Sequence, residues 1–267
     1  MKYGVSTLMK GTVEEFFDKA RNSFEAVEIV CDSPYRRPLE VNTEFLRSVK
    51  RSLSIEYSVH CPFTDADIGA VDDSVRGRSV DGVLEAIEVA SIIGAPIVVV
   101  HPARGSRGSL EERDRVKGLE KESLARIHEF AVSRETRICL ENMPSGLPFA
   151  ERSLASGVMH LAKGLAGAGI TFDVGHANTT TVAAEKMLRH LGNLTSHVHV
   201  HDNAGSLDEH LEVGLGTVNW PAVVRGLVEL RFEGILMDES LNVEAARRGI
   251  NLLKRIEQEA TGREACK

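Results

Sequence analysis

Histidine, aspartate and glutamate residues recur at the ends of short apolar runs in this 267-residue sequence. His60, His101, Glu141, Asp173 and Glu239 each close a run rich in valine, isoleucine or leucine. If these runs are parallel strands of one barrel, their carboxyl ends meet at one rim and the side chains converge there. Imidazole and carboxylate groups together suit Zn²⁺, Mn²⁺, Fe²⁺ or Co²⁺, whereas an all-oxygen set suits Mg²⁺ or Ca²⁺. The pattern therefore predicts a divalent metal site.

The strongest individual candidate is Glu141, because it ends the apolar run 137–141. An unpaired carboxylate in such a strand carries a large desolvation cost, which a metal ion or a cationic partner relieves.

Three histidines alternate with valines in the predicted strand 196–202. Alternate residues of a strand point to opposite faces, so the valines pack outward and His197, His199 and His201 point into the barrel. Histidines at different depths cannot all reach one metal ion. His197, the deepest, is predicted to be structural, and the spacing leaves both His199 and His201 as candidate ligands.

Two loop motifs extend the candidate set. Asp173 is followed three residues later by His176, and Gly175 permits a sharp turn between them. Asp208 and His210 lie two residues apart after the predicted strand 196–202, so an extended chain would aim both in the same direction.

The elements that must position these residues alternate regularly along the chain. Between the apolar runs lie helical signals, such as the possible capping boxes Thr12–Glu15 and Ser109–Glu112 and a stripe in 80–90 that is followed by Gly94. A last helix is expected over 243–259. The eight predicted strands are 2–6, 26–30, 55–60, 96–101, 137–141, 170–173, 196–202 and 235–239.

Eight strand–helix alternations predict an α/β fold of the (β/α)₈ TIM-barrel type. A doubly wound open sheet is the alternative, but it usually has fewer strands and a glycine-rich turn after the first one, which this chain lacks. We expect one domain over 1–267, with residues 260–267 as a frayed tail.

The composition narrows the functional classes. Apolar residues make up 42% and charged residues 27%, which is ordinary for a globular protein and excludes disordered or fibrous architectures. The net charge of −7 weakens the case for broad nucleic-acid binding. The longest apolar run is too short to span a membrane, and no signal peptide is recognisable, so we expect a cytoplasmic protein with no membrane partner. The four dispersed cysteines predict reduced thiols.

Taken together, these motifs resemble the xylose-isomerase-like TIM-barrel superfamily, which includes sugar isomerases and epimerases and the endonuclease IV type of abasic-site nuclease. The resemblance covers essentially the whole chain. It is carried by His60–Cys61–Pro62–Phe63, His101–Pro102, Leu140–Glu141–Asn142, the run from Phe172 to Asn178, and the run from His199 to Gly216.

The resemblance implies a ligand set but not the number of ions. In the epimerase-like members one divalent ion, often Mn²⁺, is held at positions that match Glu141, Asp173, His199 and Glu239. The nuclease holds three zinc ions at those positions and at five more, which match His60, His101, His176, Asp208 and His210. We therefore expect one to three zinc or manganese ions per chain.

Two activities follow from the resemblance. A sugar or sugar-phosphate isomerase or epimerase would use Glu141 and Glu239 as acid and base and pass through a cis-enediolate. A zinc phosphodiesterase would cleave abasic-site DNA. This chain departs from the nuclease pattern at Asp173–Val174–Gly175–His176 and at Val213–Gly214–Leu215–Gly216, so sugar chemistry is favoured. A metal-binding barrel without catalysis is a third reading.

Several residues on the expected active-site side are candidates for substrate binding. Arg37 (in Tyr35–Arg36–Arg37), Arg104 and Arg107 could bind a phosphate of a sugar phosphate or of DNA. Phe63 could line the pocket, and His201 is assigned to substrate once His199 is taken as the ligand. Trp220 is expected to be a packing residue. The substrate's identity and the oligomeric state are not predicted.

Overall fold

Eight parallel strands close into a barrel in chain order, and β8 pairs with β1. The computed structural model describes residues 1–8, 11–20, 23–32 and 37–262. The predicted (β/α)₈ barrel is confirmed, and the open sheet is wrong because no edge is left between β1 and β8. The strands are β1 (Lys2–Ser6), β2 (Ala26–Val30), β3 (Glu56–His60), β4 (Ile97–Val100), β5 (Arg137–Glu141), β6 (Gly169–Asp173), β7 (Thr195–Val200) and β8 (Ile235–Asp238).

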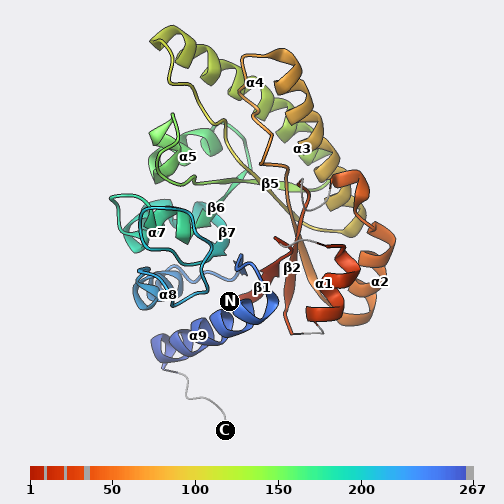
Figure 1. Ribbon diagram of the computed structural model, residues 1–267, viewed down its shortest axis with the longest axis vertical. Coiled ribbons are helices and arrows are strands. Elements are labelled where there is room, and N and C mark those ends of the chain that lie inside the picture. The colour runs from red at the N-terminus through yellow and green to blue at the C-terminus, as the bar shows by residue number, and fades with distance from the viewer. Residues whose placement is uncertain (9–10, 21–22, 33–36, 263–267) are drawn as a thin grey trace.

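The helices surround this barrel (Figure 1). A short helix, α6, begins directly after β6 and precedes the outer helix α7. Short 3₁₀ helices lie at Pro38–Glu40, Ala150–Ser153 and Gly192–Leu194. The α-helices are α1 (Val13–Ala20), α2 (Thr43–Leu53), α3 (Asp73–Ile93), α4 (Leu110–Ser133), α5 (Ala155–Lys163), α6 (Val174–Asn178), α7 (Ala184–Leu191), α8 (Trp220–Glu229) and α9 (Val243–Thr261).

Most of the helix signals in the sequence act as expected. Thr12 and Glu15 form both hydrogen bonds of a capping box, each 3.2 Å long. Gly94 ends α3 with a φ of 68°, a left-handed conformation that glycine adopts without strain. At α4 only the Ser109 half of the predicted box forms, with the hydroxyl accepting from the backbone N–H of Glu112. Helix α9 continues to Thr261, and residues 263–267 of the expected tail lie outside the described residues.

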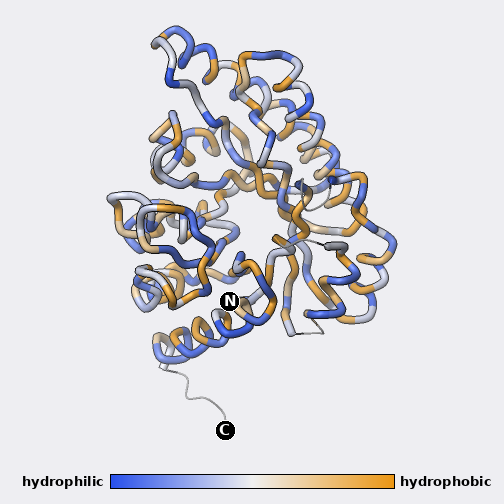
Figure 2. Tube along the Cα trace, in the orientation of Figure 1, coloured by the Kyte–Doolittle hydropathy of each residue, from blue (hydrophilic) through white to orange (hydrophobic). Residues whose placement is uncertain are grey.

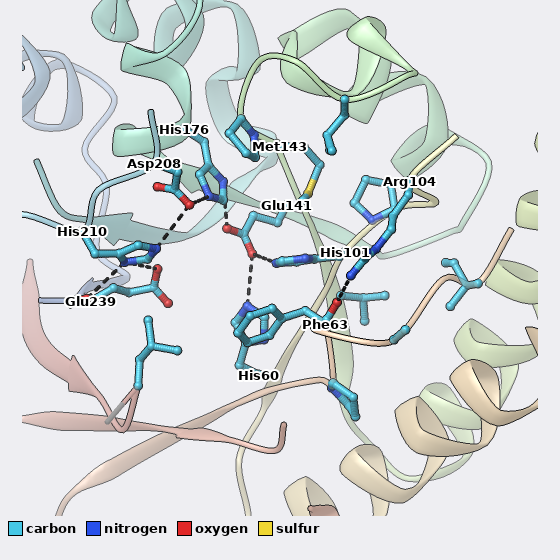
Figure 3. Close-up of a pocket in the computed structure, with 18 of the residues that line it drawn as sticks. His60, Phe63, His101, Arg104, Glu141, Met143, His176, Asp208, His210 and Glu239 are labelled. Carbon is cyan, nitrogen blue, oxygen red and sulfur yellow. Dashed lines mark hydrogen bonds and ion pairs between the residues drawn. The ribbon is translucent and has the colours of Figure 1, made fainter. Parts of the chain in front are cut away.

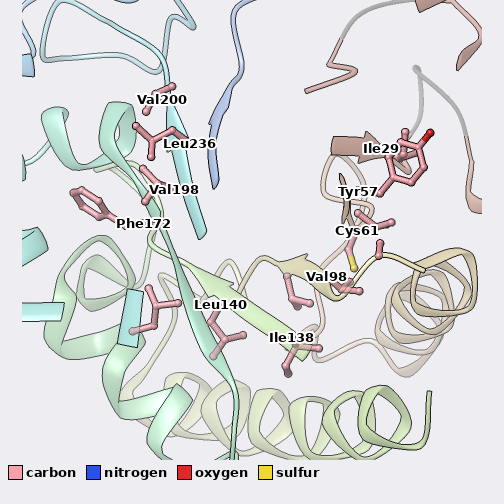
Figure 4. Close-up of a cluster of buried hydrophobic side chains, with 14 of the residues drawn as sticks. Ile29, Tyr57, Cys61, Val98, Ile138, Leu140, Phe172, Val198, Val200 and Leu236 are labelled. Carbon is pink, nitrogen blue, oxygen red and sulfur yellow. The ribbon is translucent and has the colours of Figure 1, made fainter. Parts of the chain in front are cut away.

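The apolar core lies between the barrel and its helices. Hydrophobic residues run along the strands, whereas both kinds of residue occur around the outer helices (Figure 2). Val198 and Val200 are fully buried on the outer face of β7, where they join a cluster with residues of other strands such as Leu140 and Phe172 (Figure 4). This outward packing leaves the inward positions of β7 to its histidines. No helix in the described part of the chain is long and apolar enough to cross a membrane.

Helix α2 provides a test of this packing, because Leu46 is its one fully buried residue, at 0% exposure. Leu46→Ala should lower the free energy of unfolding by about 2–5 kcal/mol, since it removes buried methyl groups and leaves a cavity. Leu39→Ala is the matched control, because Leu39 is 82% exposed, and it should change stability by less than about 0.5 kcal/mol. Urea denaturation measures both. Equal effects of the two substitutions would contradict the described packing of α2.

Candidate metal centre

The carboxylate of Glu141 lies at the centre of the barrel mouth (Figure 3). Its Oε2 is 3.0 Å from Nε2 of His101 and 3.3 Å from Nε2 of His60. Its Oε1 is 3.2 Å from Nδ1 of His176 and 3.4 Å from Nδ1 of His199. One carboxylate therefore connects residues that β3, β4, α6 and β7 deliver to the same point.

A second group of contacts surrounds His199. Its Nδ1 lies 3.4 Å from Glu141 Oε1, 3.7 Å from Asp173 Oδ2 and 3.5 Å from Glu239 Oε1. All four of these residues are at most 4% exposed. Three carboxylates thus approach one imidazole nitrogen in a region that solvent barely reaches.

A third group surrounds Asp208, in the loop between β7 and α8 (Figure 3). Its Oδ2 is 3.2 Å from Nε2 of His176 and 3.3 Å from Nε2 of His210. The nine residues that the sequence indicates as metal ligands are therefore brought together in three connected groups around Glu141, His199 and Asp208.

Three of the histidines have a ring nitrogen fixed by a backbone carbonyl. Nδ1 of His60 lies 2.8 Å from the carbonyl of Cys61, and Nδ1 of His176 lies 2.8 Å from that of Asn142. Nδ1 of His210 lies 3.2 Å from the carbonyl of Glu239. In each ring this contact orients Nε2 toward a carboxylate, the arrangement that is typical of metal-ligating histidines.

The groups of the centre shift each other's pKa values. Burial is the largest single effect on Glu141 and favours its neutral form. The charges and hydrogen bonds of neighbouring histidines, above all His101 and His199, outweigh it and hold the pKa of Glu141 well below its usual value. Burial likewise disfavours a charged His60, but Glu141 raises its pKa to about 9. Burial acts in the same direction on His210, whose pKa is raised to about 9 by Asp208 and Glu239. Burial lowers the pKa of His101.

The residues present fit a divalent metal ion. Ligand atoms about 2.1 Å from a tetrahedral ion lie roughly 3.4 Å apart, which matches the separations around His199. Both ring nitrogens of His199 are buried and lack an aligned hydrogen-bond partner among the described residues. Buried polar groups without partners are rare in folded proteins. Glu141, Asp173, His199 and Glu239 would hold an ion here, and His60, His101, His176, Asp208 and His210 could hold others.

Close packing shapes the β6 end of the centre. A Cβ added to Gly175 would lie only 2.0 Å from Cε1 of His201, so this position admits no side chain. Asn142 bonds the backbone of Asp173 at both its N–H and its C=O, each at 2.9 Å. These contacts set the position of Asp173 and of the α6 turn that carries His176.

The residues proposed for substrate binding divide into two groups. Phe63 and Arg104 line a cavity of about 330 Å³ above the centre. Arg37 and Arg107 are exposed and are not among the residues that line it, while Tyr35 and Arg36 lie outside the described residues. His201 is fully buried, stacks on His210 with ring centroids 4.1 Å apart, and has its Nε2 3.2 Å from Asp173. Its contacts are therefore with ligand candidates and not with the cavity.

Asp202 and Glu28 are among the buried carboxylates to which the sequence assigned no role. Asp202 accepts hydrogen bonds from the indole of Trp220 at 2.8 Å and from the backbone of Gly214 and Val218, and so organises the loop that delivers Asp208. Glu28, in β2, is fully buried and lies 3.0 Å from Nε2 of His197. The signal that marks Glu141, a carboxylate within an apolar strand, is also present at Glu28.

Comparison with known proteins identifies the family of this chain. The model of the xylose isomerase-like TIM barrel family matches residues 17–256. The chain belongs to the xylose isomerase-like TIM barrel family. An uncharacterised relative in this comparison, MJ1311 of Methanocaldococcus jannaschii, is 34% identical over 95% of this chain and 88% of its own length. The recognised superfamily resemblance is thereby confirmed.

Solved structures extend the comparison. The crystal structure of a D-tagatose 3-epimerase-like protein is 30% identical, with a TM-score of 0.90, and the match covers 99% of this chain and 100% of that one. An L-ribulose 3-epimerase structure shares the fold, with a TM-score of 0.83 over 98% of this chain and 96% of that one, at 16% identity.

The raised pKa values of His60 and His210 predict how this xylose isomerase-like barrel responds to pH. With pKa values of about 9, both imidazoles are expected to carry a proton at pH 7 in the metal-free protein, whereas metal ligation needs the neutral form. A metal ion that binds to these two histidines must displace their protons. The affinity for the metal ion should therefore rise about tenfold per pH unit for each displaced proton, up to about pH 9. Calorimetry in buffers of different ionisation enthalpy measures the release. His160→Gln, on the exposed face of α5, should leave the release unchanged. Zero release at pH 7 would contradict the assignment.

Proposed function

We propose that this protein is a divalent-metal-dependent isomerase or epimerase of a sugar or sugar phosphate. The observation that carries the proposal is the placement of Glu141 and Glu239, whose oxygens lie 3.4 Å and 3.5 Å from the same nitrogen of His199. Both carboxylates line the same small cavity. The printed name of the 30%-identical structure, a D-tagatose 3-epimerase-like protein, supports a sugar substrate.

The chemistry requires removal of a proton from the carbon between a carbonyl and a hydroxyl group, and its return. A divalent ion, when bound, would stabilise the negative charge that develops on the oxygen. Glu141 lines the cavity as a carboxylate, so it is placed to accept the proton. Glu239 directly follows β8. It is placed to return a proton to the neighbouring carbon of the substrate, as in an isomerase, or to the opposite face of the same carbon, as in an epimerase. The intermediate between the two transfers is a cis-enediolate.

The cavity walls favour such a proton transfer. Phe63, Met143 and Leu241 are among the apolar residues that line it, so they are placed to contact the carbon skeleton of a bound sugar. Arg104 also lines it, and its guanidinium donates to the carbonyl of Phe63 at 2.6 Å. Its positive charge is placed to attract an anionic group such as a phosphate. The volume of about 330 Å³ suits a small molecule.

A zinc phosphodiesterase acting on abasic-site DNA is the second candidate. It is favoured by the groups around Glu141 and Asp208, because His60, His101, His176 and His210 supply ligands beyond those that one ion needs. The net charge of −7 opposes association with a DNA backbone. About three zinc ions per chain together with cleavage of abasic-site duplex would favour this candidate over the isomerase.

The variant Glu239→Gln tests the proposal. It removes a proton carrier and one ligand, so turnover should fall by at least about a hundredfold and metal affinity should also weaken. Turnover is measured as deuterium incorporation from heavy water into a panel of ketoses and ketose phosphates, with metal content by elemental analysis.

Glu233→Gln is the matched control, because Glu233 is an exposed residue that precedes the opposite end of β8. It should retain wild-type metal content and exchange rate. Full exchange activity in Glu239→Gln would refute the role of this carboxylate. Absence of exchange by the metal-loaded wild type across the panel would refute the isomerase itself.

A further inference from the structure

Glu28 is a fully buried carboxylate in the middle of β2, at 0% exposure. Its Oε2 accepts hydrogen bonds from Oγ of Ser58 on β3 at 2.8 Å and from Nε2 of His197 on β7 at 3.0 Å. Both bonds go to the same oxygen, and the one from His197 holds the carboxylate across the inside of the barrel. The other oxygen, Oε1, has no hydrogen-bond partner among the described residues.

That second oxygen faces His199. Oε1 of Glu28 lies 3.1 Å from Nε2 of His199, although the two atoms are not aligned for a hydrogen bond. The opposite ring nitrogen, Nδ1, faces Glu141, Asp173 and Glu239. The imidazole therefore stands between Glu28 on one side and the candidate metal ligands on the other.

This position has a chemical consequence. An imidazole that binds a metal through Nδ1 keeps its proton on Nε2, and in a buried site that N–H needs an acceptor. A carboxylate in that place orients the ring and raises the basicity of the ligating nitrogen. Oε1 of Glu28, 3.1 Å from Nε2, is a carboxylate oxygen close enough to serve as that acceptor.

We propose that Glu28 is a positioning residue of the metal centre. Its Oε1 would accept a hydrogen bond from the Nε2–H group of His199 and so direct Nδ1 toward the metal. The proposal rests on the proposed function, because it assumes that Glu141, Asp173, His199 and Glu239 hold an ion. The hydrogen bond from His197, across the barrel, holds Oε2, so that Oε1 is left for His199.

Burial of the carboxylate supports this role over a purely structural one. A carboxylate inside a barrel is costly to desolvate, and apolar side chains of similar volume commonly replace buried polar groups without loss of stability. Packing alone would not need an acceptor with a second oxygen directed at a ligand.

The test compares Glu28→Gln with Ser58→Ala. In the wild type, the two oxygens of Glu28 face three donor groups, those of Ser58, His197 and His199. Glu28→Gln replaces one of these oxygens by an NH₂ group, which cannot accept a hydrogen bond. Ser58→Ala removes a donor to Oε2 and leaves the Oε1–His199 contact. Mn²⁺ affinity by calorimetry should fall about 10- to 100-fold in Glu28→Gln and by less than about threefold in Ser58→Ala, with unfolding temperatures reported for both.

A spectroscopic readout separates positioning from general damage. In histidine-¹⁵N-labelled, Zn²⁺-loaded wild type, His199 should show an Nε2–H resonance that is shifted downfield and protected from exchange. That resonance should move upfield or vanish in Glu28→Gln and persist in Ser58→Ala. If Glu28→Gln does not fold, Glu28→Asp retains the charge but withdraws the oxygen from His199, and its affinity should fall about tenfold.

The outcomes are distinct. Wild-type Mn²⁺ affinity and an unchanged His199 resonance in a folded Glu28 variant would overturn the positioning role and leave the proposed function standing. A wild-type protein that binds no divalent ion would overturn both. Weakened binding and a lost resonance in the Glu28 variant alone would support the role.

Discussion

The close approach of four carboxylates to a set of buried histidines is the interaction on which the account of this molecule depends. Glu141, Asp173 and Glu239 surround Nδ1 of His199 from one side, and Glu28 approaches Nε2 from the other. Ionised groups in such a place are costly unless each has an opposite charge. The carboxylates raise the pKa values of His199 and His60 despite their burial, whereas burial lowers the pKa of His101. A divalent ion at this point would add a positive charge among the carboxylates.

The fold serves this arrangement through closure. Parallel strands that are hydrogen-bonded in chain order bring β3 and β8, which are remote in sequence, to the same rim. The outer apolar faces of the strands pack on the helices and provide the stability, so the inner positions are available for polar groups. Buried carboxylates outside the candidate ligand set also form contacts near the rim: Asp202 bonds the loop that carries Asp208, and Glu28 bonds His197 on β7.

The sequence predicts the rim well because its signals are local. Alternation along β7 directs His199 inward, and apolar runs that end in His60, Glu141 or Asp173 mark strand ends. Long-range geometry is not predicted: alternation alone could not choose between His199 and His201, and the structure brings Nδ1 of His199 to three carboxylates. Arg37 and Arg107 were expected near the substrate from their loops, but loop conformation sets where a long side chain ends, and both lie away from the cavity lining.

Anomalous diffraction from crystals grown with Mn²⁺ tests the central claim most directly. Data collected on both sides of the manganese absorption edge should show a peak within bonding distance of Nδ1 of His199 and of oxygens from Glu141, Asp173 and Glu239. A peak elsewhere in the chain, or none at saturating Mn²⁺ with these four side chains well ordered, would contradict the account.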